Sequence, residues 1–343
     1  MTRPFNADRC IKCGACMRAC PVVQEETTSM FDGPRSLAVD SSRFSHEVNS
    51  LRDNIFACSM CWKCADVCPS RVEMPRAILR ARADMFDRNA ALPGHTKMMQ
   101  NIDVDGLSVR RELDSLSLGV EKASVLYFPG CIAGQKFRNI ADGVVRTLLQ
   151  NATVRTPSGL VCCGSPLEKV GDRVRMEALR KRNLKLFEGR SQIVTSCPGC
   201  TSHINDQYGV EALHIVEYLV ESVGLAKLKF RNHGVVRVVL HEPCHLKRTV
   251  GPHAIDYCYD ILQSMPGIRV LDMAEPDRCC GGGGGLLSGY PDVAMDLART
   301  KIEDAAASGA DVVLAPCPFC VLNLKQAGGM DVMDLTEFIS FRF

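Results

Sequence analysis

Two adjacent cysteines followed by an unbroken run of glycines place the strongest constraint on this chain. Cys279 and Cys280 precede the glycines at positions 281–285, which carry no Cβ atom, so this backbone can approach a bulky group closely and present N–H groups to it. Two neighbouring thiols do not fit a zinc tetrahedron built from paired C-x2-C motifs, but both can reach a larger inorganic cluster. The segment therefore predicts a cluster-binding turn in which Gly281 and Gly282 lie against the bound group.

The double cysteine belongs to a pattern of five cysteines that occurs twice. The first set contains Cys131, Cys162, Cys163, Cys197 and Cys200, and its double cysteine is followed by Gly164, for which the same role is predicted. The second set contains Cys244, Cys279, Cys280, Cys317 and Cys320. Matching cysteines are 113, 117 and 120 residues apart, measured from 131 to 244, from 162 to 279 and from 197 to 317. A nearly constant separation indicates an internal duplication.

Two further cysteine runs lie near the N-terminus, each with the spacing C-x2-C-x2-C-x3-C-P. This is the spacing of bacterial ferredoxins with two [4Fe–4S] clusters, in which the fourth cysteine of each run binds the other cluster. One cubane cluster is therefore predicted on Cys10, Cys13, Cys16 and Cys68, and another on Cys20, Cys58, Cys61 and Cys64. Zinc is the alternative metal, but zinc modules use pairs of C-x2-C and have no use for the third cysteine.

The overall composition excludes several classes of protein. The chain has 343 residues, 19 cysteines and a formal net charge of +2, so neither nucleic acid nor an anionic membrane is expected as a partner. A chain of this length does not need disulfides, and no signal peptide is recognised at Met1, so reduced thiols and a cytoplasmic location are expected. No apolar run reaches the length of a membrane span, so any membrane contact is expected to come through a partner.

The predicted fold is a mixed α+β arrangement of several domains. Residues 1–95 are expected to form a helical ferredoxin-like domain with two cubane clusters, and residues 96–122 a connector. Strands that alternate with helices then predict two α/β halves with parallel sheets, residues 123–232 and 233–343, related by a pseudo-twofold axis.

Individual elements follow from the pattern of apolar residues. Helices are expected over 45–56, over 76–88 after a proline, and over 213–222. Strands are expected over 123–128, 192–195, 235–240 and 311–315, and each delivers cysteines at its carboxyl end, where open α/β sheets build their sites.

Two features lie outside these motifs. Cys258 is expected to be a buried, small hydrophobic residue within a helix. The aromatic tail over 338–343 is interpreted as a helix end that packs into the core, with a docking patch as the alternative.

The cysteine patterns resemble those of a known family. The five-cysteine pattern, the phrase His241-Glu242-Pro243-Cys244-His245 and the glycine run after Cys280 are similar to the catalytic B-type module of heterodisulfide reductases. The N-terminal runs resemble the C-type subunit that feeds this module, and the fused chain resembles the D-type subunit. The iron–sulfur subunits of glycolate oxidase and anaerobic glycerol-3-phosphate dehydrogenase are similar as well. The resemblance covers nearly the whole chain and implies a non-cubane [4Fe–4S] cluster on each five-cysteine set.

Two functions are compatible with this resemblance. The first is an oxidoreductase subunit in which two cubane clusters relay electrons to two non-cubane clusters that reduce or form a thiol heterodisulfide, such as that of coenzymes M and B. The alternative is a subunit that only transfers electrons, from a flavoprotein that oxidises a 2-hydroxy acid or glycerol 3-phosphate toward quinone. No convincing flavin or nicotinamide motif is found, so a flavoprotein, cytochrome b or hydrogenase-type partner is expected. A redox-inert zinc scaffold is a third hypothesis.

Cleavage of a disulfide needs two protons as well as two electrons. His245 directly follows Cys244, and imidazole donates protons near neutral pH, so His245 is the candidate catalytic residue. Its counterpart in the first half is Ile132. The alternative role for His245 is a hydrogen bond to a cluster sulfide that tunes the reduction potential. Lys247 and Arg248 could meet an anionic substrate, although such residues more often form a solvated face.

Overall fold

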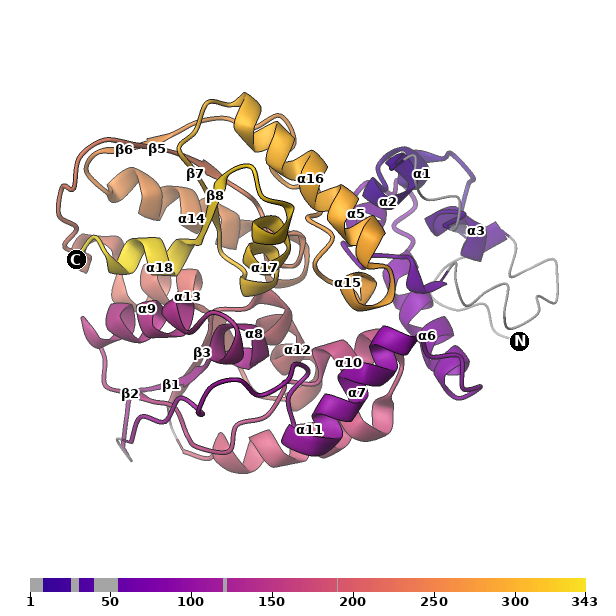
Figure 1. Cartoon of the computed structure of the whole chain (residues 1–343), viewed down its shortest axis with the longest axis horizontal. Helices are drawn as coiled ribbons and strands as arrows, with labels where there is room; N and C mark the ends of the chain where they lie inside the picture. The colour runs from indigo at the N-terminus through magenta and orange to yellow at the C-terminus, as the bar shows by residue number, and fades with distance from the viewer. Residues whose placement is uncertain (1–8, 26–30, 40–54, 120–121, 190) are drawn as a thin grey trace.

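A computed structural model describes residues 9–25, 31–39, 55–119, 122–189 and 191–343. Figure 1 shows a helical N-terminal part on one side of the molecule and two α/β halves stacked on each other beside it. The predicted helix over 45–56 lies almost entirely outside the described residues. Among the helices of the described segments, none is long and apolar enough to cross a membrane.

Short helices make up the described N-terminal part. They are α1 (Ala15–Arg18), α2 (Pro21–Gln24), α3 (Pro34–Val39), α5 (Lys63–Asp66), α6 (Met74–Phe86) and α7 (Pro93–Asp105). Three of them, α2, α6 and α7, carry a proline in the first turn, where the missing N–H is not needed for the helix. The predicted helix over 76–88 is thus found as α6. Helix α7 packs against α15 of the second half and so ties the two parts together.

The first half contains a sheet of four parallel strands in the order β2–β1–β3–β4. The strands are β1 (Val125–Phe128), β2 (Val154–Arg155), β3 (Gln192–Thr195) and β4 (Ala212–His214). The helices are α8 (Gly130–Gln135), α9 (Arg138–Leu149), α10 (Ser165–Val170), α11 (Arg173–Leu186), α12 (Pro198–Tyr208) and α13 (Ile215–Glu217), followed by the helical turns η2 (Tyr218–Val223) and η3 (Leu225–Lys227). All four side chains of β1 are buried, as expected for a parallel strand covered on both faces.

The second half repeats this topology with the strand order β6–β5–β7–β8. The strands are β5 (Val236–Leu240), β6 (Ile268–Val270), β7 (Val312–Ala315) and β8 (Asp331–Asp334). Between and after them lie η4 (Leu246–Val250), α14 (Pro252–Ser264), α15 (Leu286–Gly289), α16 (Pro291–Ala307), α17 (Pro318–Ala327) and α18 (Leu335–Ser340). Register is equivalent too, since Thr195 pairs with His214 in the first sheet and Ala315 with Asp334 in the second.

Contacts between the two halves are reciprocal. Helix α9 of the first half packs on α18 of the second, and their counterparts α14 and α13 also pack together. In the same way, α8 contacts α17 and η4 contacts α12. An exchange of equivalent contacts is what a pseudo-twofold axis produces, so the predicted duplication of a parallel α/β unit is confirmed. One apolar core runs through both halves and includes Val144, Ile261 and Leu335.

Most predicted elements are found, with two omissions. The short outer strands β4 and β8 were not predicted, so the helix expected over 213–222 begins with two residues that belong to β4. Cys258 is fully buried in α14, as expected. In the C-terminal tail, Phe338 and Ile339 are buried, which agrees with a helix end that packs into the core.

Candidate iron–sulfur centres

The first predicted cubane site lies near the surface of the N-terminal part. Its four cysteines, here called the outer group, line one small cavity; they are Cys10, Cys13, Cys16 and Cys68. Cys13 is exposed and the other three are partly buried. The left-handed conformation of Gly14, at a φ of 77°, lets α1 start directly after Cys13 and carry Cys16 toward the other thiols.

The second predicted cubane site is buried beneath the first. Its cysteines, here called the inner group, are Cys20, Cys58, Cys61 and Cys64, and each is less than a tenth exposed. Burial raises the pKa of Cys64, and the neighbouring thiols of Cys58, Cys61 and Cys16 raise it further. Since Cys16 belongs to the outer group, the two groups adjoin each other. The structure thus brings together the cysteines that spacing assigned to each cubane cluster.

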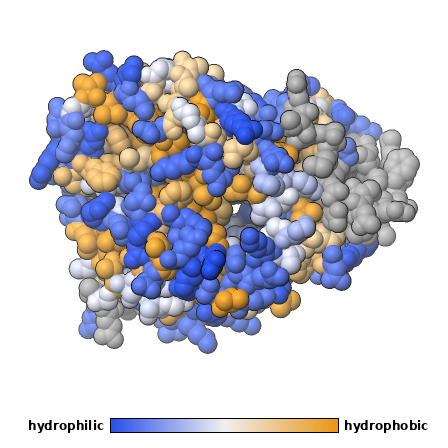
Figure 2. Space-filling model, viewed as in Figure 1, coloured by the Kyte–Doolittle hydropathy of each residue, from blue (hydrophilic) through white to orange (hydrophobic). Residues whose placement is uncertain are grey.

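The two five-cysteine sets meet at the carboxyl ends of the strands. Cys131 and Cys197 follow β1 and β3, and Cys244 and Cys317 follow the equivalent strands β5 and β7. All ten cysteines of the two sets line a single cavity of about 230 Å³. Residues of α7, α15 and α17 form part of its wall, and Figure 2 shows a hollow on the surface where these helices come together.

The thiols of different groups are in direct contact. Cys61 of the inner group packs with Cys244 and Cys279 of the second set. Cys317 of the second set in turn lies beside Cys197 of the first set, and this contact raises the pKa of Cys317. A continuous series of thiols therefore runs from the surface of the N-terminal part, through the inner group and the second set, to the first set.

The chemistry of these donors fits iron–sulfur clusters. All 19 cysteines are free thiols, and even the close pair Cys280 and Cys320 has its sulfurs 3.2 Å apart, against about 2.05 Å in a disulfide. Close thiol neighbours and burial raise the pKa of Cys131 and of Cys279, so thiolates here require a compensating positive charge. Coordinated iron supplies that charge and deprotonates its thiol ligands.

Backbone N–H groups also face these sulfurs. The N–H of Gly281 donates to Cys279 Sγ at 3.4 Å, and that of Ser108 donates to Cys131 Sγ at 3.5 Å. Such donors stabilise the charged form of a thiol and tune the clusters that thiols hold.

The predicted cluster-binding glycines have a second reason to lack a side chain. A Cβ on Gly281 would lie 2.5 Å from the carbonyl oxygen of Ala294 in α16, and one on Gly282 would lie 2.7 Å from that of Phe319 in α17. Gly164 has a φ of 96°, which favours glycine, and starts α10 directly after the first double cysteine. Gly282 also lines the cavity, whereas Gly281 and Gly164 do not belong to its described wall.

His245 and Lys169 bring polar groups to the otherwise apolar cavity. His245 Nδ1 lies 3.5 Å from Cys244 Sγ, and burial lowers the pKa of this histidine to about 4. Lys169 is the one residue with a formal charge among the described residues of the lining. The alternative predicted for Lys247 and Arg248, contact with an anionic substrate, is not supported, because neither belongs to the described lining and both pair with Asp277 instead.

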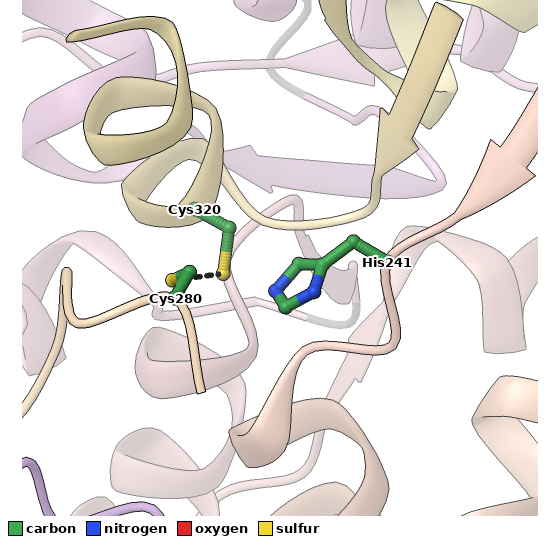
Figure 3. A group of neighbouring side chains, drawn as sticks. All are labelled: His241, Cys280 and Cys320. Carbon is green, nitrogen blue, oxygen red and sulfur yellow. Dashed lines mark hydrogen bonds between the residues drawn. The ribbon is translucent and has the colours of Figure 1, made fainter. Parts of the chain in front are cut away.

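Two important residues were missed by sequence reasoning. Arg82 on α6 is fully buried, and its guanidinium donates to carbonyl oxygens of the N-terminal part and of both halves, including those of Cys58, Lys169 and Gly284. Its position one turn after the buried Ile78 was the available signal. His241 is fully buried next to Cys280 and Cys320 (Figure 3). It precedes Cys244 in the quoted phrase but was given no role.

Comparison with known proteins agrees with this arrangement. The 4Fe-4S dicluster domain family matches residues 6–72, and the cysteine-rich domain family matches residues 125–205 and again 238–325. The B-type subunit of fumarate reductase (CoM/CoB) from Methanothermobacter marburgensis is 31% identical, over 97% of this chain and 72% of the relative. The D-type subunit of dihydromethanophenazine:CoB–CoM heterodisulfide reductase from Methanosarcina mazei is 26% identical, over 98% of this chain and 94% of the relative.

A solved structure shares the fold. The crystal structure of a hypothetical protein from Helicobacter pylori superimposes with a TM-score of 0.62 at 10% identity, over 95% of this chain and 70% of the other. Matched cysteine-rich domains, a matched dicluster domain and relatives aligned over nearly the whole chain lead to one assignment. The chain belongs to the family of iron–sulfur proteins that join a 4Fe-4S dicluster domain to two cysteine-rich domains and that includes the D-type subunit of heterodisulfide reductase.

Proposed function

We propose that this chain is an oxidoreductase subunit that relays electrons through two cubane clusters to two five-cysteine clusters, where a disulfide is converted to two thiols or the reverse. The outer and inner groups would hold the cubane clusters, and the first and second sets would hold the non-cubane clusters. When bound, these clusters supply or accept electrons one at a time. The observation that carries the proposal is that all ten cysteines of the two sets line one cavity.

A shared cavity suits a substrate with two sulfur atoms. Cleavage of R–S–S–R′ takes two electrons and two protons and gives RSH and R′SH, so two redox sites on opposite walls can each serve one sulfur. A subunit that only transfers electrons needs no such cavity. The cavity therefore favours the disulfide hypothesis over the alternative in which the chain merely connects a flavin dehydrogenase to quinone.

The cavity wall suggests what kind of disulfide would bind. Its apolar side chains, such as Met98, Val109 and Leu322, would exclude water, while Lys169 would attract an acidic group on the substrate. Sulfur compounds with acidic groups are thus the proposed substrates, in line with the CoB–CoM heterodisulfide in the relatives' names.

His245 is the proposed proton donor of the cavity. The imidazole lies beside Cys244, and burial keeps it neutral at physiological pH by lowering its pKa to about 4. Negative charge on bound clusters would act in the opposite direction and raise this pKa, because an opposite charge favours the imidazolium form. Its role as a donor is proposed from this position and this chemistry.

The partner of this chain would be a redox subunit. The exposed thiol of Cys13 places the outer group where another protein can approach it. A flavoprotein, a cytochrome b or a hydrogenase-type subunit would supply or accept the electrons there. Any attachment to a membrane would come through such a partner, and the proposed location of the chain is the cytoplasm.

Anaerobic purification followed by metal analysis and an activity assay tests the proposal. We expect a brown protein with about 16 iron atoms per chain, from four clusters of four irons, that reduces an acidic heterodisulfide with reduced viologen as donor. Stoichiometric zinc in place of iron would contradict the cluster assignment. Full iron content without disulfide turnover, combined with electron transfer to a flavoprotein, would support the electron-transfer alternative.

A further inference from the structure

His241 follows β5, and its side chain points at the second set. Its backbone N–H donates to the carbonyl oxygen of Leu314 at 2.9 Å, which fixes the residue at the end of the sheet. The imidazole faces Cys280 and Cys320, and one ring nitrogen and the two sulfurs all lie within 4.8 Å of one another (Figure 3). The three side chains come from the end of β5, the double-cysteine loop and α17, so the whole second half cooperates to bring them together.

The imidazole of His241 is buried without a hydrogen-bond partner among the described residues. The side chain is fully buried, and both Nδ1 and Nε2 are unpaired. A buried polar group left unpaired costs about 1–3 kcal/mol, and such groups in folded proteins are nearly always paired. Since the thiols in front of the ring belong to the second set, the natural partner of His241 is the group that those thiols hold.

The first half has no equivalent of this contact among its described residues. Phe128 stands at the position of His241, because Phe128-Pro129-Gly130-Cys131 corresponds to the segment that ends at Cys244. Its ring packs edge-on against Phe187, with ring centroids 5.9 Å apart, and offers no nitrogen.

The first half contains another buried histidine, but its setting differs. His203 Nδ1 already pairs with Glu168 at 3.1 Å. Among the described residues, His203 belongs to no comparable group of histidine and cysteine donors within 4.8 Å of one another. Its counterpart in the second half, at the offset of 120 residues that separates Cys197 from Cys317, is Asn323.

We propose that His241 gives the iron–sulfur cluster of the second set a nitrogen contact that the cluster of the first set lacks, and that this contact gives the second set the higher reduction potential of the two. The inference rests on the proposed occupancy of the five-cysteine sets by iron–sulfur clusters. Both forms of contact act in one direction, because histidine in place of cysteine on iron raises the potential of a cluster, and an N–H donated to cluster sulfur stabilises its more negative, reduced state.

The position of the second set gives this inequality a purpose. The second set is the one that adjoins the inner group, through Cys61 and Cys279. A higher potential at this set favours the arrival of electrons from the N-terminal part. The two sets would therefore differ in electronic character although they offer the same five sulfurs.

Two substitutions that exchange residues between the pseudosymmetric positions test the proposal. His241→Phe gives the second set the residue that the first set has at Phe128. His203→Asn gives the first half the residue found at Asn323 and serves as the matched control. Iron and sulfide content is measured first, followed by redox titrations monitored by low-temperature electron paramagnetic resonance.

The expected result separates one cluster from the rest. In His241→Phe, iron content is retained and one redox transition moves to lower potential, while the other transitions keep their positions. In His203→Asn, none of the transitions moves. Full iron content with all transitions unchanged in His241→Phe would overturn the proposal but leave the proposed function intact, whereas wild-type protein without iron would overturn the proposed function itself.

A measurement on the unaltered sequence decides the case if His241→Phe fails to fold. Wild-type protein labelled with ¹⁵N-histidine is examined by pulsed electron paramagnetic resonance, which detects nitrogen nuclei close to a paramagnetic cluster. We expect a histidine nitrogen coupling that persists in His245→Ile, since His245 is the other histidine next to the second set. Absence of any histidine coupling, or its complete loss in His245→Ile, would contradict the role of His241.

Discussion

Lys169 shows how a single side chain sets the charge of the cavity. Its Nζ atom donates to Ser165 Oγ at 3.0 Å and lies 3.6 Å from Glu168 Oε2. Glu168 is itself engaged by His203 Nδ1 at 3.1 Å and by Gln207 at 3.1 Å, so this carboxylate is not dedicated to the lysine. The ammonium group therefore retains donors for an anion in the cavity.

We predict that Lys169→Gln raises the KM for an acidic disulfide by roughly 10- to 100-fold and changes kcat much less. The reason is that a charge-assisted hydrogen bond contributes about 1.5–3 kcal/mol to binding, and an interaction made equally in ground and transition states affects KM alone. Steady-state kinetics with reduced viologen measure both constants. Lys181→Gln, at an exposed position of α11, is the control and should behave like wild type. An unchanged KM in Lys169→Gln would remove this lysine from substrate binding.

Asp334 is a second residue whose environment has a measurable consequence. Its Oδ1 caps α18 by accepting from the N–H groups of Thr336 and Glu337, while Oδ2 is buried without a partner among the described residues. Burial raises the pKa of this carboxyl to about 7, and the neighbouring Glu337 contributes in the same direction. Tyr127 and Cys258 also face Asp334.

We predict that Asp334→Asn stabilises the protein relative to wild type more at pH 8 than at pH 5.5. Between about pH 4 and pH 7, the folded state holds a proton on Asp334 that the unfolded state has lost, so this group's contribution to stability falls as pH rises. The effect amounts to at most about 4 kcal/mol for a shift of three pKa units. Thermal midpoints at the two pH values measure it, and the exposed Asp331→Asn on the same strand should leave the pH dependence unchanged. A parallel pH profile for Asp334→Asn would contradict the prediction.

At the scale of secondary-structure elements, α6 joins three parts of the molecule. Arg82 projects from this helix and donates to the carbonyl oxygens of Ile55, Lys169 and Gly284 at 2.6–3.0 Å. These acceptors belong to the N-terminal part, to α10 of the first half and to the glycine run of the second half. A planar guanidinium with several donors suits such a junction, whereas lysine offers only a point charge.

We predict that Arg82→Met destabilises the junction by about 3–5 kcal/mol, because several buried carbonyl groups lose their donor together. Thermal unfolding and limited proteolysis of the anaerobic protein measure the effect. Arg82→Lys should recover only part of the stability, since it keeps the charge but not the fork of donors. Arg80→Met, on the exposed face of the same helix, should be nearly neutral. Equal behaviour of Arg82→Met and Arg80→Met would rule out a junction at this helix.

The elements also show what could be predicted from sequence. Long amphipathic helices such as α11 and apolar strands such as β1 and β3 were found near their expected bounds, because their patterns are local. The outer strands β4 and β8 were missed because they are short and carry polar residues such as His214 and Asp331. The members of each cysteine group were predictable from spacing, since cluster geometry fixes that spacing.

Relations between distant segments were not predictable in the same way. The contact of Cys61 with Cys279 and the burial of Arg82 depend on how the N-terminal part docks on the halves, and no local pattern encodes that docking. The duplication suggested that the two sets lie near one another, but not that they share one cavity. His241 was likewise visible in the sequence, yet only the fold shows that its ring faces the second set.

At the scale of the whole molecule, a group of ion pairs holds the N-terminal part against the second half. Asp277 pairs with Lys63 at 2.7 Å, with Lys247 at 3.5 Å and with Arg248, which also pairs with Asp66 at 3.2 Å. Although burial opposes it, these cations hold the pKa of Asp277 below its ordinary value. Arg248 further donates to the carbonyl oxygen of Cys61 at 3.5 Å, so the ion pairs lie directly beside the contact between the inner group and the second set.

We predict that Asp277→Asn slows delivery of electrons from the N-terminal part to the cavity without loss of iron. Removal of the carboxylate leaves the nearly buried Arg248 with only the exposed Asp66, and breaking a buried ion pair costs about 3–5 kcal/mol. Disulfide turnover is measured with two donors: a reduced ferredoxin, which is too large to enter a cavity of about 230 Å³, and a small viologen, which can act at the cavity itself. We expect the ferredoxin-driven rate to fall about tenfold or more and the viologen-driven rate to change little.

The control for this experiment is Asp311→Asn, which removes a comparable aspartate–arginine pair with Arg237 on the exposed surface of the second half. Surface pairs contribute little, so both rates should stay at the wild-type level in this variant. Equal loss of both rates in Asp277→Asn would place the defect in the cavity, and unchanged rates would mean that electrons do not pass the contact of Cys61 with Cys279. A selective loss with the protein donor would instead link the ion pairs around Asp277 to the path by which electrons enter the second half.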